Sequence, residues 1–273
     1  MVQETPKPFR KIFSPLWMQT LPHSALEVQW QPEPIQKPAS LQRAEKAFWN
    51  KLLKKTPSAN LFNGPLAELE SFQLKTNRLL LSLRLSNYRT FMYSNFHREK
   101  ILTNYGEAFV NQGLGISAVV RTEGNKIVLM KRSEQVGEYP GKLDVFGGHI
   151  EPGKHSVNGV PDPFLGIREE LKEELNLFSE DIRDLRIIGM IRNSETAKPE
   201  LVFLAQSPLS FEKIREKATH ATDAGEYISL ISVTDKSEAI RKYLKENTDC
   251  FSPSGLGSLW VYTHLRSRTS DHF

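Results

Sequence analysis

The chain has 273 residues, of which 39% are hydrophobic and 25% charged, and its formal net charge is +4. This is the balance of an ordinary globular protein, long enough to bury a core without disulfide bonds. It excludes a disordered chain. The basic residues are scattered rather than clustered in a stripe, so a nucleic-acid partner is not expected.

Two features bear on location. Cys250 is the only cysteine, which excludes an internal disulfide and favours a reducing compartment. The first ten residues lack the basic-then-apolar order of a secretion signal, and no apolar run approaches the ~20 residues needed to span a bilayer. We therefore expect a cytoplasmic protein without a membrane segment.

The first part of the chain mixes helix and strand patterns. Three prolines interrupt residues 31–39, and apolar residues at helical spacing then predict a helix over 41–54. Asn63-Gly64 marks a turn, and residues 79–85 (LLLSLRL) have strand character. We predict an N-terminal α+β subdomain over residues 1–110.

The pattern changes at about residue 113. Short β-rich runs at 115–121 and 126–130 flank a hairpin-like turn, and a strand at 143–146 ends at Gly147-Gly148. A polar loop runs to residue 163. The remaining predicted elements are helices at 164–177, 211–219 and 236–245 and strands at 186–191, 200–204 and 227–233. Strands alternating with helices predict an α/β fold over residues 111–273, with helices on both faces of the sheet.

The predicted helix at 164–177 carries a cluster of carboxylates. At 100° per residue, one stripe of it faces the core: Phe164, Ile167, Leu171 and Leu175. Glu170, Glu173 and Glu174 lie beside that stripe at i, i+3 and i+4, where like charges repel. Such a cluster suits a hard cation such as Mg²⁺. A solvated, Glu-rich surface helix is the alternative, and the Gly-Gly strand end before the loop favours a site.

This segment resembles the Nudix box, G-x5-E-x7-R-E-U-x-E-E-x-G-U, where U is aliphatic. Gly148 matches the first glycine, and residues 170–177 (ELKEELNL) match the end of the box. The segment departs from the pattern in four ways. Lys154 occupies the first Glu position, Glu169 the Arg position and Asn176 the second glycine, and the loop holds about seven extra residues.

The wider sequence is similar to the branch of Nudix hydrolases that act on UDP-glucose and UDP-galactose. The similarity covers LFNG at 61–64, LRLSNYRTF at 83–91, KRS at 131–133, VGEYPG at 136–141 and GGH at 147–149. The resemblance implies a Nudix α/β/α sandwich preceded by an N-terminal subdomain that shapes the nucleotide pocket. It also implies Mg²⁺-dependent hydrolysis, with Mn²⁺ as the alternative ion, of a nucleotide-sugar substrate, UDP-glucose or UDP-galactose, to UMP and a sugar 1-phosphate.

Helical spacing and the resemblance together suggest roles in the metal site. Glu170 and Glu174 are the expected direct ligands, aided by a backbone carbonyl at Gly148 or its neighbour, and Glu173 acts through water. Glu226 is the expected residue that orients the attacking water, with Asp223 and Glu151 as competitors.

Substrate contacts are expected from two further groups. Arg132 and Lys198 are candidates for the diphosphate. Tyr88, Arg89 and Phe62 are candidates to stack on a uracil. The alternatives are surface solubility for the two basic residues and core packing for the aromatic ones.

Three other functions stay open. The same chemistry could act on ADP-ribose or another ADP-linked diphosphate, on coenzyme A or on a dinucleoside polyphosphate. Lys154 and the disturbed Arg-Glu pair would also suit a catalytically weak nucleotide-binding sensor. An RNA pyrophosphohydrolase is the last alternative, and the sequence gives no oligomeric state.

Overall fold

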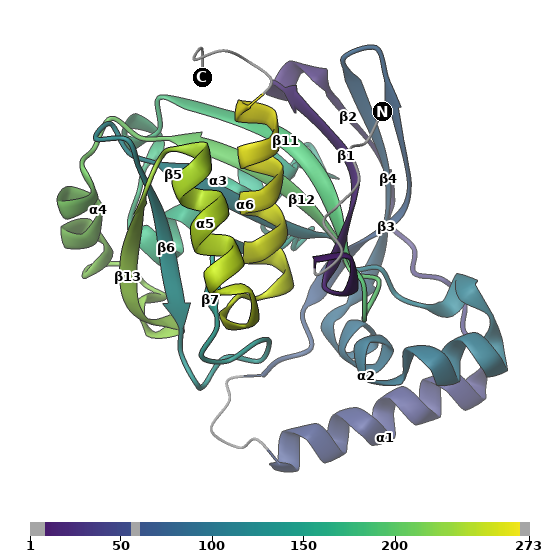
Figure 1. Ribbon diagram of the computed structural model, residues 1–273. Coiled ribbons are helices and arrows are strands. Elements are labelled where there is room, and N and C mark those ends of the chain that lie inside the picture. The colour runs from purple at the N-terminus through teal and green to yellow at the C-terminus, as the bar shows by residue number, and fades with distance from the viewer. Residues whose placement is uncertain (1–8, 56–60, 268–273) are drawn as a thin grey trace.

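The computed structural model describes residues 9–55 and 61–267 and centres on one mixed sheet (Figure 1). Its order is β1-β11-β12-β5-β6-β13, with β7 beside β6 and β8 beside β5. β12 and β5 run parallel, and the other neighbours are antiparallel. The strand bounds are β1 Phe13–Leu21, β5 Gly115–Arg121, β6 Lys126–Arg132, β7 Leu143–Asp144, β8 Phe146–His149, β11 Asp184–Asn193, β12 Pro199–Gln206 and β13 Tyr227–Thr234.

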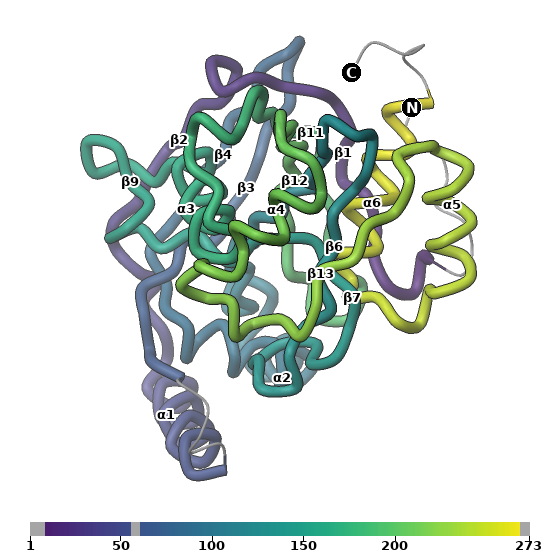
Figure 2. Tube along the Cα trace, turned by 90° about the vertical axis from the view of Figure 1, so that its left-hand side faces the viewer, coloured from purple at the N-terminus to yellow at the C-terminus, as the bar shows by residue number. Residues whose placement is uncertain are grey.

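Helices cover both faces of this sheet. Figure 2 shows α5 (Ser237–Glu246) and α6 (Pro253–Arg266) on one side and α3 (Pro163–Leu175) and α4 (Phe211–Ala218) on the other. Successive side chains of β5 alternate between the two cores: Ile116 and Ala118 pack on the α3 side and Val119 on the α6 side. The predicted α/β fold with two helix layers is confirmed.

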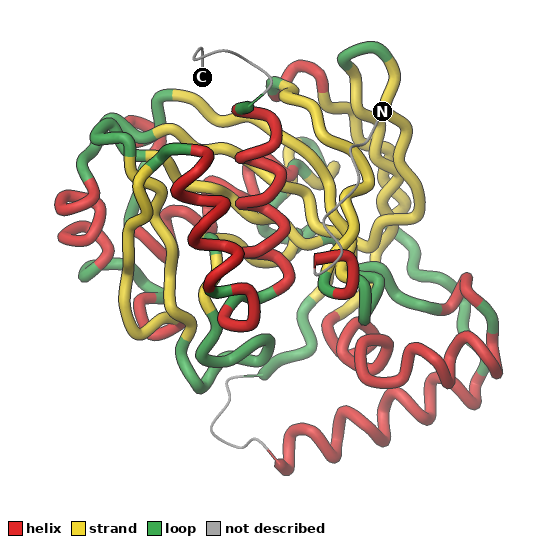
Figure 3. The backbone as a smooth tube through the Cα atoms, in the orientation of Figure 1, coloured by secondary structure: helices red, strands yellow, loops and turns green. Residues whose placement is uncertain are grey.

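The N-terminal part contributes a smaller sheet and two helices. β2 (Leu26–Gln31), β4 (Arg78–Asn87) and β3 (Pro65–Lys75) form a three-stranded sheet. α1 (Ala39–Lys55) and α2 (Tyr88–Tyr105) pack together below it (Figure 3). β1 instead pairs with β11 at the edge of the main sheet. The boundary at residue 110 stays a prediction.

Most elements after residue 111 lie where the sequence places them. The prediction of a single strand at 143–146 is wrong. This segment splits at Val145 into β7, which pairs with β6, and β8, which pairs with β5. The predicted loop before α3 contains a small hairpin, β9 (Ser156–Val157) and β10 (Val160–Pro161).

Several elements are not among those predicted from the sequence. They are β1, β2, β3, α2 and α6, together with 3-10 turns at Phe9–Lys11, His23–Ala25, Glu107–Phe109, Ser179–Asp181, Ala224–Glu226 and Thr248–Cys250. Within the two described ranges, no helix combines the length and apolarity needed to cross a membrane.

Candidate active site

A cavity of about 710 Å³ lies where β8 and α3 meet the N-terminal part of the chain. Among the residues that the structure describes, eight carboxylates line it, against three basic side chains, Arg132, Lys154 and Lys198. The carboxylates are Glu138, Asp144, Glu151, Glu170, Glu173, Glu200, Asp223 and Glu226. A cavity this acidic would repel a diphosphate unless cations came with it.

Helix α3 positions the central carboxylates. Asp162 caps its start by accepting hydrogen bonds from the backbone N–H groups of Phe164 and Leu165, and Asn176 ends it in a left-handed conformation with φ 55°. The predicted apolar stripe is buried, which fixes the rotation of the helix. Glu170 and Glu173 therefore face the cavity, and Glu174 lies beneath its floor.

The glycines of β8 bring backbone close to these carboxylates. The backbone N–H of Gly147 donates to Glu174 Oε2 at 2.8 Å. A Cβ on Gly148 would lie 2.4 Å from Glu170 Oε1, so any side chain there would push the carboxylate away. The Gly-Gly pair thus leaves room for Glu170 and Glu174 at the end of β8.

The pKa values of Glu170 and Glu174 are both raised, so ionising either carboxylate is unfavourable in the folded chain. Burial, with repulsion from Glu173 and Glu226, raises the pKa of Glu170 to about 8. Burial and the charge of Glu170 raise the pKa of Glu174 well above its usual range. Glu174 Oε1 is buried without a hydrogen-bond partner among the described residues. Both groups would be stabilised as anions by a nearby cation.

This arrangement fits Mg²⁺ better than a cation enclosed by protein alone. Across residues 9–55 and 61–267, no three His, Cys, Asp or Glu side chains are arranged to hold a metal ion. Mg²⁺ needs only one or two carboxylates, because water and substrate phosphates complete its shell. The unpartnered Oε1 of Glu174 and the carboxylate of Glu170 are oxygen donors of the kind that Mg²⁺ binds.

The other two acidic residues of α3 already have basic partners. Lys154 Nζ lies 2.6 and 2.9 Å from the two carboxylate oxygens of Glu173. Glu169 pairs with Lys172 and does not line the cavity.

Glu226 lies close enough to the Glu170–Glu174 pair to raise the pKa of both. Burial raises the pKa of Glu226 itself, although Arg132 opposes the shift. Burial also raises the pKa of Asp223, which, like Glu151, lines the cavity. All three candidates for orienting water therefore line the cavity, and Glu226 is the one that raises the pKa of both Glu170 and Glu174.

The two basic residues predicted for the diphosphate line the cavity but are already paired. Lys198 Nζ lies 3.3 Å from Glu138 and 3.7 Å from Glu200, over the ring of Phe91. Arg132 donates to the Glu138 carbonyl and lies 3.5 Å from Asp144. Sequence reasoning missed Glu138, Asp144 and Glu200. Only Glu138 lay in a stretch, VGEYPG, that the resemblance had marked.

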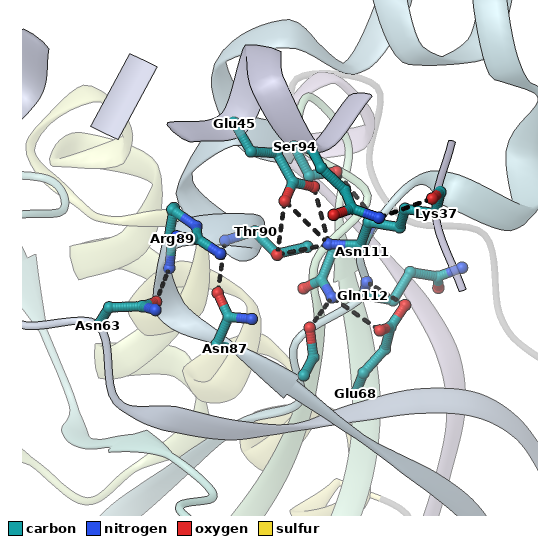
Figure 4. Close-up of polar contacts among 12 residues, drawn as sticks. Lys37, Glu45, Asn63, Glu68, Asn87, Arg89, Thr90, Ser94, Asn111 and Gln112 are labelled. Carbon is teal, nitrogen blue, oxygen red and sulfur yellow. Dashed lines mark hydrogen bonds and ion pairs between the residues drawn. The ribbon is translucent and has the colours of Figure 1, made fainter. Parts of the chain in front are cut away.

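The N-terminal part supplies an aromatic wall. Tyr88 and the 65% exposed Phe62 line the cavity, and burial raises the pKa of Tyr88 to about 12, which keeps its hydroxyl protonated. Arg89 does not line it. One position further along α2, it is rotated by about 100°, and its backbone N–H donates to Asn63 Oδ1 (Figure 4).

The proteins of known name that this chain resembles in sequence include two uridine diphosphate glucose pyrophosphatases and a Nudix hydrolase. The chain is 29% identical over 248 residues to the human (Homo sapiens) uridine diphosphate glucose pyrophosphatase NUDT22, covering 81% of this chain and 80% of that protein. It is 26% identical to the Bos taurus protein of the same name, with coverage of 82% and 86%. It is 27% identical to Nudix hydrolase 9 of Arabidopsis thaliana, with coverage of 65% and 67%. The predicted resemblance to this branch is confirmed.

Other comparisons add less. No protein-family model matches the chain. Among solved structures, an ADP compounds hydrolase is similar over 78% of this chain and all of its own, with 13% identity and a TM-score of 0.43. DR0079 from Deinococcus radiodurans is similar over 55% of this chain and 81% of its own, with 16% identity and a TM-score of 0.39. TM-scores this low carry no argument for function.

Proposed function

We propose that this relative of the Nudix hydrolases is a Mg²⁺-dependent pyrophosphohydrolase that cleaves UDP-glucose or UDP-galactose to UMP and a sugar 1-phosphate. The observation that carries the proposal is the pair Glu170 and Glu174 on α3, set against the glycines of β8 at the floor of an acidic cavity. The names of the human and bovine relatives support the nucleotide-sugar substrate.

Glu170 and Glu174 would hold the ion, with the Gly148 carbonyl as the proposed third protein ligand. When bound, Mg²⁺ screens the charge of the diphosphate and stabilises the leaving oxygen. Glu226 would orient the water that attacks phosphorus. Its raised pKa brings a carboxylate base closer to neutral pH, which suits proton transfer.

Substrate binding would use both sides of the cavity. Arg132 lies 3.5 Å from Asp144 and interacts electrostatically with Glu174 and Glu226. From there its guanidinium would contact a phosphate oxygen and stabilise the charge that develops on it. Phe62 and Tyr88 offer aromatic faces to the base. Lys198 has three N–H donors, so it could contact a phosphate oxygen while it still donates to Glu138.

The test is product analysis after incubating the purified chain with Mg²⁺ and an equal mixture of UDP-glucose, ADP-ribose and coenzyme A. We expect UMP and glucose 1-phosphate, and no turnover by Glu174→Gln. AMP from ADP-ribose would keep the chemistry and replace the uridine assignment. Metal-dependent binding of UDP-glucose without turnover would instead favour a nucleotide-binding sensor, the reading that the Lys154–Glu173 ion pair suggests.

A further inference from the structure

Lys154 is directed at α3 by a fixed turn. The backbone N–H groups of Lys154 and His155 donate to the Glu151 carbonyl at 3.0 and 2.8 Å. His155 is fully buried, and its Nδ1 accepts from the Glu151 backbone N–H at 3.1 Å. Because both arms of the turn are held, the Lys154 side chain reaches Glu173 from a defined position.

The ammonium group of Lys154 lies among four carboxylates. It contacts both oxygens of Glu173 and interacts electrostatically with Glu151, Glu170 and Asp223. Among the described residues, no three of these carboxylates are arranged to hold an ion while the ammonium group is in place. A carboxylate at position 154 would add the oxygen ligands that a hard divalent ion takes.

We propose that the ammonium group of Lys154, bound to Glu173, occupies the place that a second metal ion would take beside this carboxylate. The chain would then bind a single divalent ion, at Glu170 and Glu174. A second ion at Glu173 would have to displace the ammonium group from both oxygens. The inference rests on the metal site of the proposed function. It adds the number of metal ions bound per chain and names Lys154 as the residue that sets this number.

The test counts bound Mn²⁺ by electron paramagnetic resonance in the full chain, stripped of metal and without substrate. We expect one Mn²⁺ per chain for the wild type and two for Lys154→Glu. The matched control is Lys172→Glu, which makes the same change in charge on α3 beside Glu169, outside the cavity. It should bind one.

Two Mn²⁺ in the wild type, or one in a folded Lys154→Glu, would overturn the inference and leave the proposed hydrolase standing. No Mn²⁺ in the wild type would also overturn the inference, while product analysis with UDP-glucose still decides the proposed hydrolase. If Lys154→Glu does not fold, Lys154→Gln carries the test: a second, weaker ion must appear there and stay absent in Lys172→Gln.

Discussion

At the residue scale, Glu170 and Glu174 connect metal binding to stability. Burial raises both pKa values, that of Glu170 to about 8, above the ~4.3 of an unfolded Glu. Because the folded-state pKa is the higher one, the protonated pair favours folding below about pH 4, and this stability is lost as the pH rises to about 8.

The melting temperature of the chain in EDTA should therefore fall between about pH 5 and about pH 8. Glu174→Gln removes one buried charge and should flatten this fall. Mg²⁺ should restore stability at the upper pH in the wild type, because the ion replaces the lost proton. Thermal unfolding followed by circular dichroism measures all three. Equal slopes in wild type and variant would show that the pair does not titrate as described.

A second residue-scale prediction concerns the attacking water. If Glu226 orients it, Glu226→Gln should lower kcat for UDP-glucose by about 100-fold or more, the usual contribution of a general base. KM and Mn²⁺ binding should change little. Asp223→Asn and Glu151→Gln are the comparison variants in the same cavity. A larger loss in either of them would move the role to that residue.

Residues differed in how well the sequence predicted them. Glu170, Glu173 and Glu174 could be placed because one helix sets their spacing and a buried stripe sets its rotation. Glu138, Asp144 and Glu200 could not, because they come from a loop and two strands that meet only in the folded chain. For the same reason, no local sequence pattern could predict the ion pair between Lys198 and Glu138.

At the element scale, packing overrode local preference where prediction failed. α6 begins with a Ser252 cap and Pro253 but contains Gly255 and Gly257, which disfavour a helix. A Cβ at Gly257 would lie 2.3 Å from Ile191 Cδ1, so the glycine lets the helix approach the sheet. In β1, Pro15 lies at an irregularity of an edge strand, where a missing N–H is tolerated.

The pairing of β8 with β5 should depend on Gly147. Its φ is +146°, and a Cβ there would lie 2.0 Å from the Ile116 carbonyl oxygen, a backbone atom that cannot turn aside. Gly147→Ala should therefore lower the free energy of unfolding by about 3 kcal/mol or more. The control is Gly159→Ala, with φ +80° and nothing within 4 Å of an added Cβ, which should cost only about 1 kcal/mol. Urea unfolding measures both, and equal losses would mean that backbone strain alone matters.

At the scale of the whole molecule, the N-terminal helices place one wall of the cavity. Lys37 and Glu45 bind the Thr90 hydroxyl in the first turn of α2 (Figure 4). That same turn binds the Phe62 loop, since the backbone N–H groups of Tyr88 and Arg89 donate to the Gly64 carbonyl and to Asn63 Oδ1. The sequence suggested Phe62 as a contact but gave no way to see that Glu45 of α1 and Lys37 before it support that loop.

Phe62 should then affect substrate binding without affecting the chemical step. Removing a stacking ring costs about 1–3 kcal/mol, so Phe62→Ala should raise KM for UDP-glucose by about 10-fold or more at unchanged kcat. Phe96→Ala is the matched control: Phe96 is 64% exposed against 65% for Phe62, but it lies on α2 and does not line the cavity. Steady-state kinetics on both variants separates the cases. A raised KM in Phe62→Ala alone places the base on this wall. An unchanged KM would put the base elsewhere in the cavity and leave the 65% exposed ring without a binding role.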